Sequence, residues 1–430
     1  MSDRKTPLLV VVLTLFGVVA GCGGLGVIAG IATASAARAE ESLVDAALGG
    51  RGLGDLRYRF ERVDQDGRAE IGRANTAHVR LGYETGSFLD THMLIEFETI
   101  VRIGAEDYND TYNRKTRFPV IADPEATEMN QGYLDFKGLE KTSIRVGRQR
   151  INIDNQRFVG GVAFRQNEQT FDAATVTTDI IADTRIRYGY VLNINTIFGD
   201  GLAGRDRASN THLFNVGYDG FEVGKLTGYS YLVDTNNFAQ SSSATIGLRF
   251  SGRHAFEFAP DVSVLYTAET ARQWNYGGNP GDFSLGYVSL EPGLGYRTFT
   301  ARLGYEFLDG DGADAFQTPL GTNHAFNGIT DLFLTTPADG LQDAYLKLAY
   351  RFADPEPLRG TVLKAAYHQF WGDRDGRHFG SEWNLTVART FKELTPLNAS
   401  LTLSAQFAAY KADRFGADVN KLWLTAQFKF

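Results

Sequence analysis

The sequence predicts an all-β protein: a closed transmembrane antiparallel β-barrel of about 18 strands, preceded by a signal peptide. Three observations predict this class: an apolar export segment at the N-terminus, alternation of apolar and polar residues along most of the remaining chain, and alternation of short and long connections. The mean hydropathy of the 430 residues is −0.22, so nothing beyond the N-terminus indicates a helical membrane protein.

The N-terminal segment has the parts of a secretory signal. Arg4 and Lys5 precede a long apolar run, and Ala37-Arg38-Ala39 followed by Glu40 gives the A-x-A cleavage pattern. We therefore expect a signal peptide over residues 1–39 and one barrel domain over 40–430. Two alternatives are an uncleaved anchor, because the run is long enough to span a membrane, and lipidation at Cys22, whose surroundings resemble a lipoprotein cleavage box.

Removing this segment would change the chemistry that the chain offers. Cys22 is the only cysteine, so a chain cut after Ala39 has neither a disulfide framework nor a thiolate metal site. The formal charge would move from −8 to −10, because the segment carries three cations and one carboxylate. A net acidic exported protein is not expected to bind nucleic acid.

Strand signals begin near residue 55 and continue to the end of the chain. In DLRYRFER, Arg57 and Arg59 alternate with Leu56 and Tyr58, and in TAHVRLGYE Arg80 faces away from its apolar neighbours. Charges at alternate positions of an apolar strand need water on that side. Alternation predicts 18 strands, centred on Tyr58, Val79, Ile95, Leu134, Ile144, Ala173, Tyr188, Phe214, Tyr229, Leu248, Leu265, Leu290, Leu303, Leu348, Ala365, Leu385, Leu403 and Leu424.

The connections give an independent signal. Turns at 85–87, 138–140 and 219–220 are short, whereas 102–128, 199–210, 271–282 and 309–342 are long and polar. Short turns on one rim and long loops on the other are typical of outer-membrane barrels, whose short rim is periplasmic. An even strand count places both termini at that rim.

The last ten residues, KLWLTAQFKF, alternate strictly and end on Phe430. Leu424 and Phe428 fall on one face of the strand, and Lys421 and Lys429 on the other. A last strand that closes the barrel needs this lipid-facing alternation, and the final Phe resembles the signal read by the outer-membrane barrel assembly machinery. An ordinary last strand that happens to end in Phe is the alternative.

Two stretches carry a family resemblance. Residues 144–173, IRVGRQRINIDNQRFVGGVAFRQNEQTFDA, resemble the signature of the alginate-export family of porin-like outer-membrane proteins, and residues 304–346 resemble that family's long-loop segment. Phe164 and Ile329 stand where that pattern has Trp. The resemblance implies an 18-stranded barrel in the bacterial outer membrane with a constricted, cation-lined channel; the best-understood members pass the anionic polysaccharide alginate outward.

Arginines are the candidate residues of such a channel, because guanidinium groups bind carboxylates and a ring of them gives a pore anion preference. The candidates are Arg145, Arg148, Arg150, Arg157 and Arg165 in the first motif, with Arg57, Arg59 and Arg80 on the first two strands. Arg145 has inward parity, whereas Arg148 and Arg150 share the parity of outward residues. Either a bulge at Gly147 re-phases the strand, or the strand has already left the membrane by that point. The alternative is that these arginines pair with Glu168, Asp154 and Asp172.

Other constellations are weaker. Asp309, Asp311 and Asp314 alternate as in calcium loops but lack the spacing of an EF-hand, so a solvated loop is favoured. The histidines show no paired spacing for zinc, and no P-loop, Rossmann or G-x-S-x-G motif appears. We therefore expect neither an enzyme nor a cofactor.

The predicted function is passive passage of anionic solutes, including anionic oligo- or polysaccharides such as alginate, through an outer-membrane channel that contacts membrane lipid and lipopolysaccharide. The alternatives are a general uptake porin of low selectivity, an adhesin, or an outer-membrane hydrolase assembled across strands.

Overall fold

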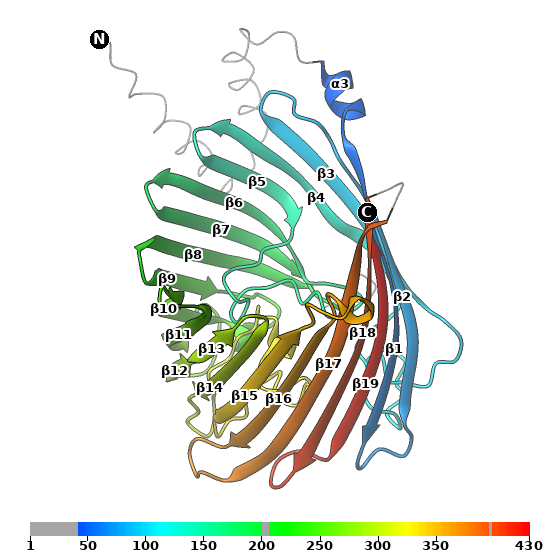
Figure 1. Cartoon of the computed structure of the whole chain (residues 1–430), viewed down its shortest axis with the longest axis vertical. Coiled ribbons are helices and arrows are strands. Elements are labelled where there is room, and N and C mark those ends of the chain that lie inside the picture. Colours follow the sequence, from blue (N-terminus) through cyan, green and yellow to red (C-terminus); the bar gives the residue numbers. More distant parts are fainter. Residues whose placement is uncertain (1–41, 200–205, 395–397) are drawn as a thin grey trace.

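A computed structural model describes residues 42–199, 206–394 and 398–430 (Figure 1). The predicted signal peptide, its Ala39 cleavage site and Cys22 lie outside these residues. A short helix, α3 (Leu43–Leu48), precedes the sheet. The first strands are β1 (Arg51–Gln65), β2 (Gly72–Glu84), β3 (Thr91–Arg102), β4 (Ala126–Leu139), β5 (Thr142–Gln149), β6 (Thr170–Ile181), β7 (Thr184–Asn195), β8 (Arg207–Phe221), β9 (Gly224–Val233) and β10 (Ser243–Phe256).

The remaining strands are β11 (Ala259–Asn275), β12 (Ser284–Leu290), β13 (Gly293–Tyr296), β14 (Phe299–Leu308), β15 (Leu341–Arg351), β16 (Val362–Trp371), β17 (His378–Leu394), β18 (Ala399–Ala412) and β19 (Val419–Lys429). Three 3₁₀ turns lie in the connections, η1 (Ala239–Ser241), η2 (Asn323–Ala325) and η3 (Glu356–Leu358). None of the helices in the described ranges is long and apolar enough to cross a membrane.

The sheet closes on itself as an antiparallel barrel. β1 pairs with β19 from Asp55 opposite Lys429 to Gln65 opposite Val419. β12 and β13 both lie between β11 and β14, so they occupy one position in the wall. Pro292 separates them, because proline cannot donate to a ladder. The nineteen segments therefore make 18 barrel strands, and each of the 18 predicted centres lies in a strand of its own.

The wall alternates between an apolar outer face and a polar inner face. On β1, Leu56 and Tyr58 are 37% and 41% exposed, whereas Arg57 and Arg59 are 6% and 3% exposed. The last strand behaves in the same way, since Leu424 is 44% exposed and Lys421 only 5%. This is the lipid-facing belt and polar lumen of a transmembrane barrel, as the alternation predicted.

The connections alternate in length around the two rims. Residues 103–125, 150–169 and 309–340 leave one rim, and the two-residue turns 140–141, 182–183 and 222–223 lie at the other. The start of β1 and the end of β19 meet at the short-turn rim, where Gly54 and Phe430 exchange backbone hydrogen bonds of 3.0 and 3.1 Å. The predicted rim order is confirmed.

Some predicted boundaries were wrong. β11 continues to Asn275 and β8 begins at Arg207, so parts of the expected loops 271–282 and 199–210 are strand. Asp219-Gly220 lies within β8, and the turn follows at 222–223. The alternation marks the membrane-spanning part of a strand but not its extension beyond the bilayer.

Two long loops fold into the barrel instead of away from it. In Figure 1 the segment after β5 crosses the interior. Residues 150–169 and 309–340 meet there, where Val159 and Leu320 form a parallel β-bridge and Gly160 donates its N–H to the Leu320 carbonyl at 2.9 Å. We call these segments the first and second lumen loops.

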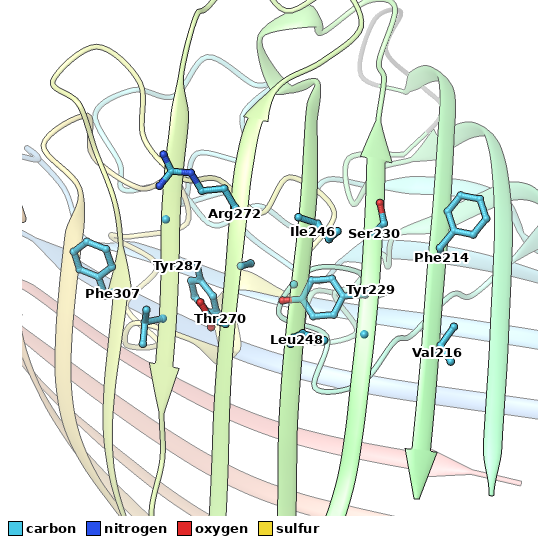
Figure 2. Close-up of a pocket in the computed structure, with 15 residues that line it drawn as sticks. Phe214, Val216, Tyr229, Ser230, Ile246, Leu248, Thr270, Arg272, Tyr287 and Phe307 are labelled. Atoms are coloured by element: carbon cyan, nitrogen blue, oxygen red, sulfur yellow. The ribbon is translucent and has the colours of Figure 1, made fainter.

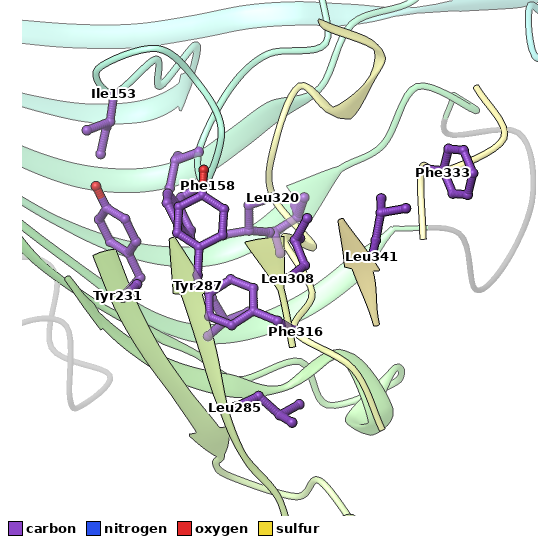
Figure 3. Packing of buried hydrophobic residues seen from close by; sticks show 14 of the residues in the cluster. Ile153, Phe158, Tyr231, Leu285, Tyr287, Leu308, Phe316, Leu320, Phe333 and Leu341 are labelled. Atoms are coloured by element: carbon purple, nitrogen blue, oxygen red, sulfur yellow. The ribbon is translucent and has the colours of Figure 1, made fainter. Parts of the chain in front are cut away.

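Apolar packing holds the lumen loops against the wall. Figure 3 shows Phe158 of the first loop and Phe316 of the second beside Tyr287 of β12. The ring centroids of Phe158 and Phe316 lie 5.4 and 5.3 Å from that of Tyr287. Full burial of each large apolar side chain contributes about 1.5–3 kcal/mol. The barrel thus has a core of its own inside the lumen.

Candidate channel constriction

Three predicted arginines line the inner face of β1 and β2. Arg57, Arg59 and Arg80 are all buried, because the lumen loops cover them. Arg57 donates to the side-chain oxygen of Gln166 at 2.8 Å and to the backbone carbonyls of Ala163 and Arg165. Arg59 donates to the carbonyl of Phe164 at 2.6 Å. These arginines anchor the backbone of the first lumen loop.

Arg80 and Arg59 also pair with carboxylates. Arg80 contacts Glu98 of β3 and Glu168, the latter at 3.4 Å. Arg59 lies 3.7 Å from Asp123, which accepts a hydrogen bond from the Gln166 backbone N–H at 2.9 Å. The end of the loop between β3 and β4 therefore also reaches into this side of the lumen.

The arginines of the first lumen loop join it to the second. Arg157 contacts Glu306 of β14 at 2.8 Å and donates to Asn327 at 2.9 Å. Arg165 contacts Asp331 at 2.7 Å and Glu61 of β1 at 3.3 Å. Both arginines are buried. Burial opposes their charge, but the surrounding carboxylates outweigh it and raise the pKa of each guanidinium.

Asp331 collects three basic partners. It contacts Arg165, Lys421 of β19 at 3.0 Å, and Nδ1 of His324 at 2.6 Å. Burial would raise the pKa of Asp331, but Lys421, His324 and Arg165 together hold that pKa well below its usual range. Phe164 stacks on His324 with ring centroids 3.5 Å apart. We call Asp331 and its three partners the Asp331 cluster.

The arginines of β5 fall on different sides of the wall. Arg145 points inward, contacts Asp135 at 2.9 Å and lies over the Tyr133 ring. Arg148 keeps the parity of the half-exposed Val146 and pairs with Asp172, its direct cross-strand partner, on the outer face. The register passes through Gly147 without a shift, so the suggested re-phasing bulge is wrong.

Arg150 breaks the expected parity for another reason. β5 ends at Gln149, so the chain turns and Arg150 reaches inward to Glu96 at 2.6 Å and to Glu168. The predicted pairings with Glu168 and Asp172 are therefore present. Asp154 instead accepts a hydrogen bond from Asn215 at 2.9 Å.

A cavity of about 180 Å³ opens between the first lumen loop and the inner faces of β5, β6 and β7. Arg145, Arg150 and Arg187 line it together with Thr175 and Thr177, and no Asp or Glu is among the lining residues. Arg145 and Arg150 keep about a third of their side chains exposed, at 30% and 31%. This is the part of the predicted arginine set that solvent can reach.

Sequence reasoning missed Arg187. Its side chain donates to Asn215 at 3.4 Å, and within the described ranges no carboxylate lies at ion-pair distance from it. The signal was present, since TRIRYGY places Arg187 on the face opposite Ile186. The weak calcium candidate comprises Asp309, Asp311 and Asp314. Asp311 accepts hydrogen bonds from two backbone N–H groups of its own turn. Among the described residues, no three or more His, Cys, Asp or Glu side chains are grouped so that they could hold a metal ion.

No family model and no curated protein matches the chain. Its fold is similar to solved structures of Occ and Opd outer-membrane porins. The similarity to OccK9 (OpdG) of Pseudomonas aeruginosa has a TM-score of 0.69 at 15% identity and covers 90% of this chain and 100% of that one. OccAB4 of Acinetobacter baumannii has a TM-score of 0.68 at 14% identity, and the match covers 89% of this chain and 98% of that one. OpdL of Pseudomonas aeruginosa has a TM-score of 0.66 at 16% identity, and the match covers 89% of this chain and 99% of that one.

These comparisons show that the chain shares the barrel fold of those structures, and they give no support to the alginate-export family in particular. The closed 18-stranded wall and its apolar belt are those of a bacterial outer-membrane protein, as predicted. The belt contacts membrane lipid.

Proposed function

We propose that this chain is a passive outer-membrane channel for anionic solutes, with small carboxylate-bearing molecules, including oligosaccharides of the alginate type, as its substrate class. One observation carries the proposal. Arg145, Arg150 and Arg187 converge on a lumen cavity whose lining contains no carboxylate. Guanidinium groups stay charged at physiological pH and bind carboxylates through two hydrogen bonds, so this cavity favours anions over cations.

The lumen loops support small solutes over long polymers. They are tied to each other and to the wall by ion pairs, backbone hydrogen bonds and apolar packing. A polymer would have to displace these contacts, whereas a small anion can be held in the cavity of about 180 Å³ beside the first lumen loop.

The test is ion selectivity in a planar bilayer across a salt gradient. We expect a reversal potential on the side of anion preference, and we expect Arg187→Glu to move it toward cation preference. Arg148→Glu is the matched control, because it makes the same charge change on the outer face, where Arg148 pairs with Asp172. Equal passage of both ions would indicate a general porin, and a barrel without conductance would indicate an adhesive or hydrolytic role.

A further inference from the structure

A groove of about 820 Å³ runs along the outer wall of the barrel. Its lining extends over β8 to β12 and β14, with Phe214 and Phe307 toward opposite ends of the groove (Figure 2). Ile246 and Leu248 project into it and are 53% and 54% exposed. The volume falls within the range of sites that hold drug-sized ligands, and the surroundings are those of the lipid-facing belt.

Small outward residues create the groove. Gly228 and Ser230 of β9 and Gly286 of β12 stand among bulky apolar neighbours. A Cβ at Gly228 would meet only Leu248, at 3.5 Å, and one at Gly286 would meet nothing closer than 3.7 Å. Neither glycine has a positive φ, so neither backbone position requires glycine. The space above them is open at positions where larger residues would complete a flat wall.

A cation lies at one end of the groove. Arg272 of β11 is exposed and donates to the side-chain and backbone oxygens of Ser284 at 2.9 and 2.6 Å. Within the described part of the chain no carboxylate lies at ion-pair distance from Arg272. The nearby Asp309 accepts the Gly286 N–H at 2.9 Å. Trp274, two residues further along the same face toward the long-loop rim, is 38% exposed, and outward Trp residues are typical of the membrane interface.

We propose that this groove binds one lipopolysaccharide molecule, with an acyl chain in the apolar slot and a phosphate on Arg272. The assignment to lipopolysaccharide rests on the proposed orientation, in which the long-loop rim faces the cell exterior. Guanidinium and phosphate match in charge and geometry, and the rim position puts Arg272 at head-group depth instead of in hydrocarbon. A concave slot suits a flexible chain better than the flat or convex wall of a second barrel.

Native mass spectrometry of the full chain with phosphorylated lipid A would test the assignment. We expect lipid A to be retained by the wild type. We expect at least tenfold weaker retention in Arg272→Gln and in the filled variant Gly228→Leu with Gly286→Leu. Arg389→Gln is the charge control, because Arg389 faces outward near the short-turn rim on β17, and Ala405→Phe on β18 is the control for added outer bulk. Both controls should retain lipid A like the wild type.

The exposed Arg272→Gln change should leave folding intact, which a heat-modifiable band on gels would verify, so this variant keeps the test decisive if the filled variant misfolds. Unchanged retention in Arg272→Gln would overturn the proposal. Equal retention of phosphatidylglycerol would overturn the assignment to lipopolysaccharide. A dimer that the filled variant loses would show that a second copy occupies the groove. The reversal potential depends on the lumen and not on this outer groove. Failure of the lipid proposal can therefore be distinguished from failure of the proposed channel function.

Discussion

Arg145 and Arg148 lie three residues apart on β5 and on opposite sides of the barrel wall. Arg145 contacts Asp135 inside the lumen at 2.9 Å, and Arg148 contacts Asp172 on the outer face at 2.8 Å. The same residue type in the same strand thus faces two different surroundings. This pair provides a matched experiment on charge selectivity.

We expect Arg145→Gln to shift the reversal potential toward cation preference, because it removes one lumen cation and leaves Asp135 paired only with the more distant Lys137, at 3.5 Å, among the described residues. A change of about 1.4 kcal/mol would alter relative anion occupancy about tenfold. The shift should weaken as salt rises, since the Debye length is about 8 Å at physiological ionic strength. Arg148→Gln should leave the potential unchanged. Equal shifts in the two variants would contradict the lumen assignment.

The Asp331 cluster should control the position of the second lumen loop. Asp331→Asn removes the shared carboxylate of Arg165 and Lys421, and breaking a buried pair in this way costs about 3–5 kcal/mol. Arg165 keeps its contact with Glu61, so we expect a cost near the lower end of this range, about 3 kcal/mol. That cost corresponds to an increase of about a hundredfold in the equilibrium constant for opening of the loop. Single-channel recordings should show a larger and noisier conductance. Asp314→Asn in the same loop should behave like the wild type.

The same cluster predicts a pH dependence. Burial lowers the pKa of His324 below its ordinary 6.5, although Asp331 partly opposes this. The opened loop then binds a proton more tightly than the closed one, so closure weakens as the pH falls below 6.5. Asp331, whose lowered pKa lies well below 3.8, stays ionised in this window. Its contribution is present above pH 3.8 and is lost only as the pH falls through that lowered value.

Conductance noise measured from pH 7 to pH 5 would follow this change. We expect it to rise in the wild type as His324 is protonated and to stay flat in His324→Gln. A wild-type conductance that does not vary over this interval would argue against the proposed role of His324.

Phe430 should matter for assembly. Its backbone pairs with Gly54, and a Cβ on Gly54 would lie 2.2 Å from the Phe430 ring. Deleting Phe430 should leave an exported chain that inserts poorly. The seam between β1 and β19 would lose its last backbone pair, and the chain would lose the last residue of the signal that the assembly machinery is expected to read. Gly54→Val should damage the same seam by collision. Normal amounts of heat-modifiable barrel in the outer-membrane fraction of the deletion variant would refute this expectation.

The long-loop rim should face the cell exterior. Asp311 is exposed in the second lumen loop, so Asp311→Cys should react with a membrane-impermeant reagent in intact cells, with Cys22→Ser as background so that the introduced thiol is the only one in the sequence. A cysteine at Glu140 in the turn between β4 and β5 should react only after lysis. The reverse pattern would invert the topology.

The sequence predicts the wall well and the lumen poorly, for a physical reason. Lipid on one side and water on the other impose a period of two on every strand, so Leu56 and Arg57 could be assigned to their faces from local pattern alone. The lumen loops depend on contacts distant in sequence, such as Arg57 with Gln166 and Arg157 with Asn327. No local pattern encodes such pairs, so the predicted arginines could not be divided into anchors and channel-lining residues.

The hydrogen bonds from Arg57 and Arg59 to the first lumen loop have an evolutionary consequence. These arginines bind the backbone carbonyls of Ala163, Phe164 and Arg165, which every amino acid possesses. Substitutions at Ala163 or at other loop positions whose side chains do not hold the loop can therefore accumulate while the loop stays in place. A barrel with this arrangement can acquire new solute preferences by point mutation while the position of the lumen loop stays unchanged.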